Sequence, residues 1–271
     1  MLSFTGFIVL TYVTFVGGLY LFQRNLLYYP DASLSSPSAA GVAEMRAVKT
    51  FTEDGFSHTS WYAPAAQGLP TLVYFQGNAG NISDRGHKAR PYLDAGLGVL
   101  LAGYRGYGGN GGSPTEVGLY ADGRAALSFL KEQGINNGKI VLYGESLGSG
   151  VAVRIAWEMA KSMPAAALVL EAPFTSMGDA AQYHYPYVPA RWLLKDGYPS
   201  ASLIADVKSP LLVVHGEQDR TVPFDFGVRL YERARPPKEN RWIAGAGHNN
   251  LYDFGVAGAV IDFLKITTGP Q

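Results

Sequence analysis

The sequence predicts an α/β fold with a mostly parallel central sheet flanked by helices. Short apolar runs alternate with longer helical patterns through most of the chain, and strands that alternate with helices form parallel sheets with right-handed crossovers. Runs such as TLVYF and LLVV are apolar on both faces, which is typical of strands covered by helices on both sides. With 271 residues, 47% of them hydrophobic, the chain can form one large domain of this kind.

An uncharged apolar segment comes first in the chain. Residues 2–22 carry no charged side chain, and a helix of that length, at about 1.5 Å per residue, spans roughly one hydrocarbon core. We therefore expect residues 1–23 to form a single-pass transmembrane helix or a membrane-docking helix. A cleaved signal peptide fits less well, because no basic region precedes the apolar run and no small-residue cleavage site ends it.

The rest of the chain is divided into a connector and one domain. Residues 24–44 are rich in Ser, Pro and Ala and form the connector, and residues 45–271 form the α/β domain. Arg24, Arg46 and Lys49 follow the apolar segment. By the positive-inside rule these few charges weakly favour a cytoplasmic location for the domain. They are too few to determine on which side of the membrane it lies.

The strands and helices of the domain follow from periodicity. Strand patterns cover residues 46–51, 56–62, 71–75, 98–102, 140–143, 167–170, 211–215 and 241–244. Helical patterns cover residues 82–95, 117–133, 147–163, 224–234 and 251–266. In the third helix, Val151, Ile155 and Met159 recur four residues apart and form one apolar face.

The alternation is interrupted over residues 177–208, which are rich in Tyr and Pro. An insertion of this length is often a lid or binding loop, so we expect a short, aromatic-rich cap. Its aromatic side chains either form a wall of the substrate pocket or pack over the edge of the sheet. Together with one tyrosine of an earlier loop, the candidate substrate contacts are Tyr107, Tyr183, Tyr185, Tyr187 and Trp192.

A serine stands at a predicted strand-to-helix turn. The strand that ends at Tyr143 continues into Gly144-Glu145-Ser146-Leu147-Gly148, and a helical pattern follows. G-x-S-x-G in this context is typical of a nucleophile elbow, whose strained turn exposes the serine hydroxyl above the sheet. A glycine-rich turn with an incidental serine is the alternative, but the strand before it and the helix after it favour the elbow.

An acid and a histidine follow the serine in the order that this turn predicts. Asp219 lies in the turn after the strand at 211–215, and His248 lies in a glycine-flanked loop after the last strand. Asp219 would orient the His248 imidazole so that it accepts the serine proton. Glu217 is the rival acid, and we expect His215 to be a packed, hydrogen-bonded core residue.

A tetrahedral intermediate also needs an oxyanion hole. One donor would be the backbone N–H of Leu147, directly after the serine, and the other should come from the loop after an early strand. That loop reads Gln76-Gly77-Asn78-Ala79. The N–H of Asn78 or of Ala79 is the candidate, and Asn78 is preferred.

Together these motifs resemble the α/β-hydrolase superfamily, in particular its membrane-anchored alpha/beta-hydrolase-domain group, which includes protein depalmitoylases and bacterial relatives. The resemblance covers nearly the whole chain, through FQRNLLYYP, QGNAGN, GYRGYGGNGGSPTEVGLYADGRAAL, GESLGSG, EAPFTSM, HGEQD and GHNNL. It implies the α/β-hydrolase fold, a Ser146, Asp219 and His248 triad, and an oxyanion hole at Asn78 and Leu147. Gln76 departs from the pattern, because the family usually has a histidine there. The backbone donor does not need that side chain, so we expect activity to survive.

The predicted function is a serine hydrolase that cleaves carboxylic esters or thioesters through an acyl-enzyme intermediate. A lipophilic acyl substrate fits the membrane segment and the aromatic insertion, as in a depalmitoylase or an acylglycerol lipase. A serine peptidase or amidase on the same fold is the alternative, and a non-catalytic membrane scaffold is a further one. Acyl transfer of this kind needs no cofactor, and the oligomeric state is left open.

Other classes of protein are disfavoured by composition and motifs. The formal net charge is +0, which argues against a nucleic-acid partner, and there are no cysteines for disulfides or thiolate zinc sites. We expect no metal site, because the sequence lacks H-E-x-x-H and paired-histidine spacing. Residues 106–111 match G-x-G-x-x-G, but the helix pattern begins only near Glu116, which is too late for a dinucleotide site.

Overall fold

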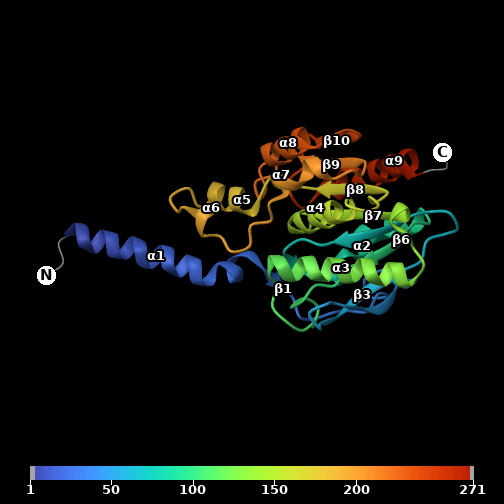
Figure 1. Ribbon diagram of the computed structural model, residues 1–271, viewed down its shortest axis with the longest axis horizontal. Coiled ribbons are helices and arrows are strands. Elements are labelled where there is room, and N and C mark those ends of the chain that lie inside the picture. The colour runs from blue at the N-terminus through green and yellow to red at the C-terminus, as the bar shows by residue number, and fades with distance from the viewer. Residues whose placement is uncertain (1–3, 269–271) are drawn as a thin grey trace.

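An eight-stranded sheet forms the centre of the protein (Figure 1), in a computed structural model that describes residues 4–268. Its order is β10-β9-β8-β7-β4-β6-β3-β2, and neighbours are parallel except that β3 is antiparallel to β2 and β6. The mostly parallel α/β prediction is therefore confirmed. The strands are β2 (Arg46–Phe51), β3 (Ser57–Ala63), β4 (Thr71–Phe75), β6 (Gly98–Leu101), β7 (Ile140–Glu145), β8 (Ala167–Glu171), β9 (Leu211–Gly216) and β10 (Lys238–Ile243).

Helices cover both faces of the sheet and create two cores (Figure 1). All five residues of β4 are buried, and they alternate between the cores: Leu72 and Tyr74 belong to one, Val73 and Phe75 to the other. This alternation explains why the run is apolar on both faces. One core includes side chains of α2 (Gly86–Asp94) and α9 (Val256–Thr268), and the other includes those of α3 (Glu116–Glu132), α4 (Leu147–Met159) and α8 (Phe224–Arg233).

Several boundaries differ from the predicted ones. The helix expected at 251–266 is divided, because Gly255 adopts a left-handed φ of 78° between a 3₁₀ turn (Leu251–Phe254) and α9. The helix expected at 82–95 is a 3₁₀ turn (Ile82–Arg85) followed by α2. Strand β10 begins at Lys238, three residues before the predicted start at 241. The prediction missed these residues because the sequence KENRWI of this edge strand is polar and contains no apolar run.

The insertion between β8 and β9 forms short helices over the carboxyl end of the sheet. They are α5 (Met177–His184), α6 (Ala190–Leu193), α7 (Ser200–Leu203) and a 3₁₀ turn (Ile204–Asp206). In Figure 1, α5 and α6 extend away from the sheet toward the N-terminal helix. The insertion is thus a helical cap that lies between the sheet and the N-terminal helix (Figure 1).

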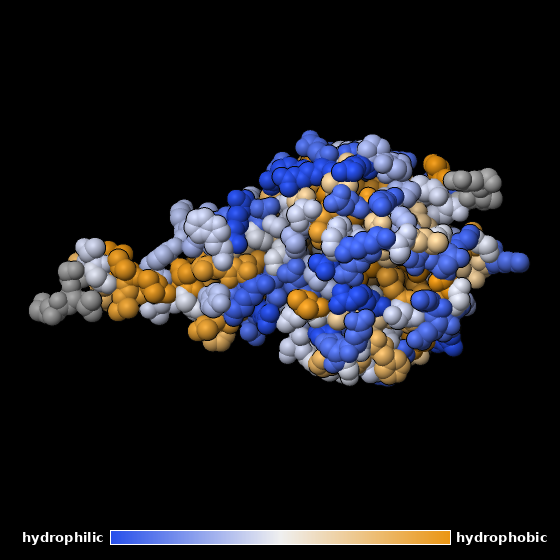
Figure 2. Space-filling model, in the orientation of Figure 1, coloured by the Kyte–Doolittle hydropathy of each residue, from blue (hydrophilic) through white to orange (hydrophobic). Residues whose placement is uncertain are grey.

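The N-terminal helix α1 (Phe4–Leu27) projects from the body (Figure 1) and is long and apolar enough to cross a membrane. It continues past the predicted end at residue 23, and residues 1–3 of the predicted segment lie outside the described residues. Figure 2 shows apolar surface along α1, whereas polar residues cover much of the visible face of the body. Length and hydropathy alone fit a membrane anchor and a signal sequence equally.

Polar contacts fasten the second half of α1 to the insertion. The Arg24 Nε donates to Asp196 Oδ2 at 2.9 Å, and the backbone N–H of Lys195 donates to Gln23 Oε1 at 2.6 Å. The same Asp196 carboxylate, which is 3% exposed, accepts the backbone N–H of Glu116 at the start of α3. Helix, insertion and body therefore meet at one buried carboxylate.

A buried ion-pair network lies beneath the turn between β7 and α4. Lys88 Nζ lies 2.8 Å from Glu171 and 3.1 Å from Glu145, and the Arg85 Nε donates to Glu145 at 2.7 Å. Burial alone would raise the pKa of Glu145, but the charges of Lys88 and Arg85 and hydrogen bonds from Arg85 and Tyr74 hold that pKa at about 2. The carboxylate next to the serine is therefore ionised at neutral pH.

Replacing Lys88 by methionine should destabilise the fold by about 3–5 kcal/mol, because Glu171 would stay buried without its cation. Urea unfolding in detergent micelles, followed by tryptophan fluorescence, measures the free energy. The double variant Lys88→Met/Glu171→Gln should recover part of the loss. Lys265→Met, which breaks an exposed pair with Asp262, should change stability by less than about 0.5 kcal/mol. Equal effects of the two single variants would contradict the prediction.

Candidate active site

Ser146 occupies a strained turn between β7 and α4. Its backbone has φ 50° and ψ −115°, a conformation that non-glycine residues rarely adopt. Glycines on both sides allow the chain to close up: a Cβ at Gly148 would lie 2.0 Å from the carbonyl oxygen of Phe75, and one at Gly144 would lie 2.5 Å from the carbonyl oxygen of Gly148. The G-x-S-x-G spacing therefore reflects backbone contacts on both sides of the serine.

The structure brings Ser146, His248 and Asp219 together. His248 Nε2 lies 3.0 Å from Ser146 Oγ, and His248 Nδ1 lies 2.7 Å from Asp219 Oδ2. The loops after β9 and β10 hold this pair, because the backbone N–H of Gln218 donates to the carbonyl oxygen of Ala246 at 2.9 Å. A hydrogen-bonded chain thus runs from a carboxylate through an imidazole to a hydroxyl, which can move a proton off the hydroxyl.

The Asp219 carboxylate is buried but well supplied with donors. Its Oδ1 accepts the backbone N–H groups of Thr221 and Val222, each at 2.8 Å. Burial by itself raises the pKa of Asp219, but the hydrogen bonds from His215, His248 and the Val222 N–H together hold it well below its usual value. Asp219 is therefore a charged acceptor at neutral pH, and the rival Glu217 is exposed.

His215 is the packed core histidine that the sequence predicts, and it has a second contact that the sequence did not reveal. Its side chain is fully buried, with Nε2 3.0 Å from the carbonyl oxygen of Val222 and 3.2 Å from Asp219 Oδ2. Gly227 of α8 makes room for it, since a Cβ there would lie 2.2 Å from His215 Nδ1. His215 therefore helps to fix the same carboxylate oxygen that contacts His248.

The loop after β4 lies against the serine. A Cβ at Gly77 would lie 3.6 Å from Ser146 Cβ, and Asn78 and Leu147 line the same pocket as Ser146. Asn78 is held from three directions, because its Nδ2 donates to the carbonyl oxygen of Leu27 at 2.8 Å and its own carbonyl accepts from Tyr29 N and Tyr107 Oη. The alternative donor Ala79 is exposed and belongs to β5 (Ala79–Gly80), which pairs with β1 (Tyr29–Pro30).

Gln76 stands one residue after β4 and is fully buried. Both polar atoms of its side chain are without a hydrogen-bond partner among the described residues. Its backbone carbonyl lies close to α4, since a Cβ at Gly148 would approach it within 2.6 Å. The residue that departs from the family pattern therefore lies in the tight contact between the β4 loop and the elbow.

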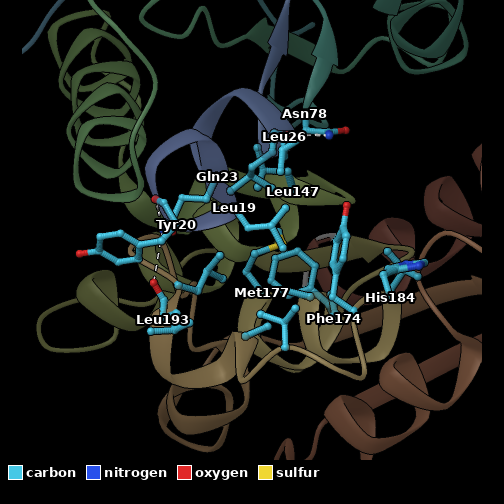
Figure 3. Close-up of a pocket in the computed structure, with 18 of the residues that line it drawn as sticks. Leu19, Tyr20, Gln23, Leu26, Asn78, Leu147, Phe174, Met177, His184 and Leu193 are labelled. Carbon is cyan, nitrogen blue, oxygen red and sulfur yellow. Dashed lines mark hydrogen bonds between the residues drawn. The ribbon is translucent and has the colours of Figure 1, made fainter. Parts of the chain in front are cut away.

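A cavity of about 510 Å³ opens at Ser146. Its walls are mostly apolar, and most of the lining residues come from the second half of α1 and from the insertion. Figure 3 shows Leu19 and Gln23 of α1 reaching the same space as Phe174 and Met177. This size is in the usual range for small-molecule sites. The remaining lining residues with a polar group include Tyr20, His184, Tyr185 and Thr221.

The aromatic residues considered as substrate contacts have different positions. Of the five, Tyr185 lines the cavity. Tyr107 is 1% exposed and its hydroxyl donates to the carbonyl oxygen of Asn78, so it supports the loop after β4. Tyr183, Tyr187 and Trp192 are not among the lining residues, and the last two are each 88% exposed, on the outer surface of the insertion.

The contribution of α1 to the cavity is the feature that sequence reasoning missed. Lining residues recur at helical spacing along one face of the helix: Val16, Leu19, Tyr20, Gln23, Leu26 and Leu27. A weak signal existed, because the polar Gln23 lies on this face of an otherwise apolar segment.

Residues 4–268 contain no group of three or more His, Cys, Asp or Glu side chains arranged to hold a metal ion.

A mostly parallel sheet that presents a serine after β7, a carboxylate after β9 and a histidine after β10 is the architecture of an α/β-type hydrolase. Solved structures share this fold. An esterase of Pyrococcus furiosus superposes with a TM-score of 0.69 at 22% identity, covering 90% of this chain and 99% of that one. An alpha-beta hydrolase of Vibrio vulnificus gives a TM-score of 0.71 at 21% identity, covering 84% and 83%.

Proteins of similar sequence include named alpha/beta hydrolases. The chain is 44% identical to an uncharacterized protein of Mycobacterium tuberculosis over 84% of this chain and 81% of that protein. It is 33% identical to alpha/beta hydrolase domain-containing protein 17B of Homo sapiens over 68% of this chain, and the match spans 62% of the human protein. No family model matches the chain. The protein belongs to the α/β-hydrolase superfamily.

Replacing Gly148 by alanine should destabilise the protein by about 1–3 kcal/mol, because the new Cβ would overlap the Phe75 carbonyl oxygen. The matched control is Gly258→Ala in α9, where a Cβ meets nothing within 4 Å. That change should be neutral or stabilise by up to about 1 kcal/mol. Urea midpoints in detergent distinguish the two sites, and a Gly148→Ala protein as stable as Gly258→Ala would contradict the close contact.

Proposed function

We propose that the protein is a serine hydrolase of lipophilic acyl esters or thioesters, anchored in a membrane by α1. The observation that carries the proposal is the hydrogen-bonded chain from Asp219 through His248 to Ser146, which opens into a largely apolar cavity. Superfamily membership supports hydrolysis, and the cavity supports an acyl chain as the part of the substrate that is bound.

The mechanism follows from the positions of the side chains. Ser146 Oγ attacks the acyl carbonyl carbon while His248 Nε2 takes its proton, and the charged Asp219 stabilises the imidazolium. The tetrahedral oxyanion accepts hydrogen bonds from the backbone N–H groups of Leu147 and Asn78. The bond from the carbonyl carbon to the leaving oxygen or sulfur breaks, and His248 gives the proton to the leaving group.

Deacylation uses the same groups in reverse order. His248 takes a proton from water, and the hydroxide attacks the acyl carbon of the Ser146 ester. The carboxylic acid then leaves as the proton returns to Ser146 Oγ. Water is the only co-reactant, and the products are the carboxylic acid and the alcohol or thiol released in the first step.

The contacts of α1 support a permanent anchor. Loss of α1 as a cleaved signal sequence would remove Gln23 and Arg24 from their buried partners on the insertion and leave one side of the cavity open. Retention of α1 keeps both the contacts and the wall. An anchor of this kind would hold the cavity close to the lipid surface.

Ser146→Ala should abolish labelling by a fluorophosphonate and lower kcat for p-nitrophenyl esters by at least about a thousandfold. The control is Ser149→Ala, one turn away in α4, whose buried hydroxyl has no partner among the described residues. That variant should be labelled and should turn over like the wild type. Labelling that persists in Ser146→Ala, or hydrolysis of peptide amides in preference to all esters and thioesters, would overturn the proposal.

Asp219→Asn should lower kcat by about 10³–10⁴-fold, because a neutral amide neither fixes the imidazole tautomer nor stabilises the imidazolium. Glu217→Gln, two residues earlier and exposed, should stay within about twofold of wild type, as surface changes usually do. Steady-state kinetics with one ester measures both variants. A loss confined to Glu217→Gln would reassign the acid.

A further inference from the structure

The inner face of α1 ends at the reaction centre. Leu26 and Leu27 line the cavity together with Ser146, and the carbonyl of Leu27 accepts a hydrogen bond from the Asn78 side chain at 2.8 Å. Two residues further, the backbone N–H of Tyr29 donates to the Asn78 carbonyl at 2.9 Å. The helix that enters the membrane is therefore bonded directly to the loop that supplies the proposed oxyanion donor.

The same face continues away from Ser146 toward the apolar part of α1. Val16 and Leu19 line the cavity two turns and one turn before Gln23, respectively, and Figure 3 shows Leu19 reaching it from the helix. The opposite wall comes from the insertion and includes Met177 and Val188. The cavity thus lies between α1 and the insertion, and its lining includes both Ser146 and residues of the apolar helix.

The amide on this face is already paired. Gln23 lines the cavity, but its amide nitrogen donates to the carbonyl oxygens of Tyr20 and Leu193 and its oxygen accepts from Lys195 N. The other α1 residues that line the cavity, apart from Tyr20, are Val and Leu, so the wall offers a ligand mainly apolar contact. A polar ligand would lose hydration here and gain few partners, whereas a hydrocarbon chain would gain burial.

We propose that α1 is a substrate-binding element as well as an anchor: its face at Val16, Leu19 and Leu26 binds the acyl chain of a long-chain lipid ester whose carbonyl lies at Ser146. This rests on the proposed function. Because one helix both lies in the bilayer and lines the cavity, the acyl chain passes from lipid to enzyme along continuous apolar surface. It avoids the cost of exposing each methylene to water.

The experiment compares two tryptophan variants of α1 in lipid nanodiscs. Leu19→Trp fills the cavity from its wall, whereas Leu21→Trp changes a position that is 70% exposed on α1 and is not among the lining residues. The measured quantity is the ratio of kcat/KM for p-nitrophenyl dodecanoate to that for p-nitrophenyl acetate. Leu19→Trp should lower this ratio by about tenfold or more, the size of effect that misfit in an apolar pocket produces.

Leu21→Trp should keep the wild-type ratio within about twofold, as expected of an exposed substitution. A second variant, Leu19→Ala, enlarges the cavity and should move the preferred ester toward longer chains. Unchanged ratios in both Leu19 variants, or equal changes in Leu19→Trp and Leu21→Trp, would overturn the assignment of α1 to the binding site.

Failure of the proposed function has a different signature. In that case the wild-type protein in nanodiscs is not labelled by fluorophosphonate and hydrolyses neither ester. If instead the wild type is labelled at Ser146 and hydrolyses acetate and dodecanoate, while chain-length preference is insensitive to Leu19, the serine hydrolase stands and α1 is an anchor only.

Discussion

The rest of the site depends on one backbone constraint, the close approach of α4 to the end of β4. Ser146 can hold its unusual φ of 50° because Gly144 and Gly148 let the neighbouring carbonyl groups come within distances that no Cβ would permit. That packing sets the hydroxyl clear of the sheet, where His248 reaches it at 3.0 Å. Strain of this kind persists only where the surroundings over-determine it, and here the ion pairs of Glu145 with Arg85 and Lys88 fix the strand side of the turn.

A second constraint links the N-terminal helix α1 to the same centre. Strand β1 pairs with β5 immediately after α1, so the loop that carries Asn78 is bonded on one side to Leu27 and Tyr29 and on the other to Tyr107. The motif FQRNLLYYP thereby acquires a physical role, because it includes the end of α1, part of the wall of the cavity and the strand β1 that pairs beside Asn78. The helix, the cavity and this loop are joined by direct contacts.

The sequence predicts the sheet well because its central strands are buried on both faces and carry unbroken apolar runs, as β4 and β9 do. It predicts β10 less well, because an edge strand with the sequence KENRWI needs no such run. The relative placement of Ser146, Asp219 and His248 follows from chain order and strand ends. The role of α1 could not be predicted in the same way, since an apolar helix has the same composition whether lipid or a cavity covers a given face. For Trp192 and Tyr187, aromatic character alone does not say which way a side chain points, and both are exposed.

Asp196 shows what this arrangement means for the modularity of the protein. A single buried carboxylate receives Arg24 from α1 and the N–H of Glu116 from the body, and it belongs to the insertion itself. Exchange of one of these segments for that of another hydrolase leaves a charge or a donor unmatched unless the new segment supplies the same partner. A chimera should therefore exchange α1 and the insertion together.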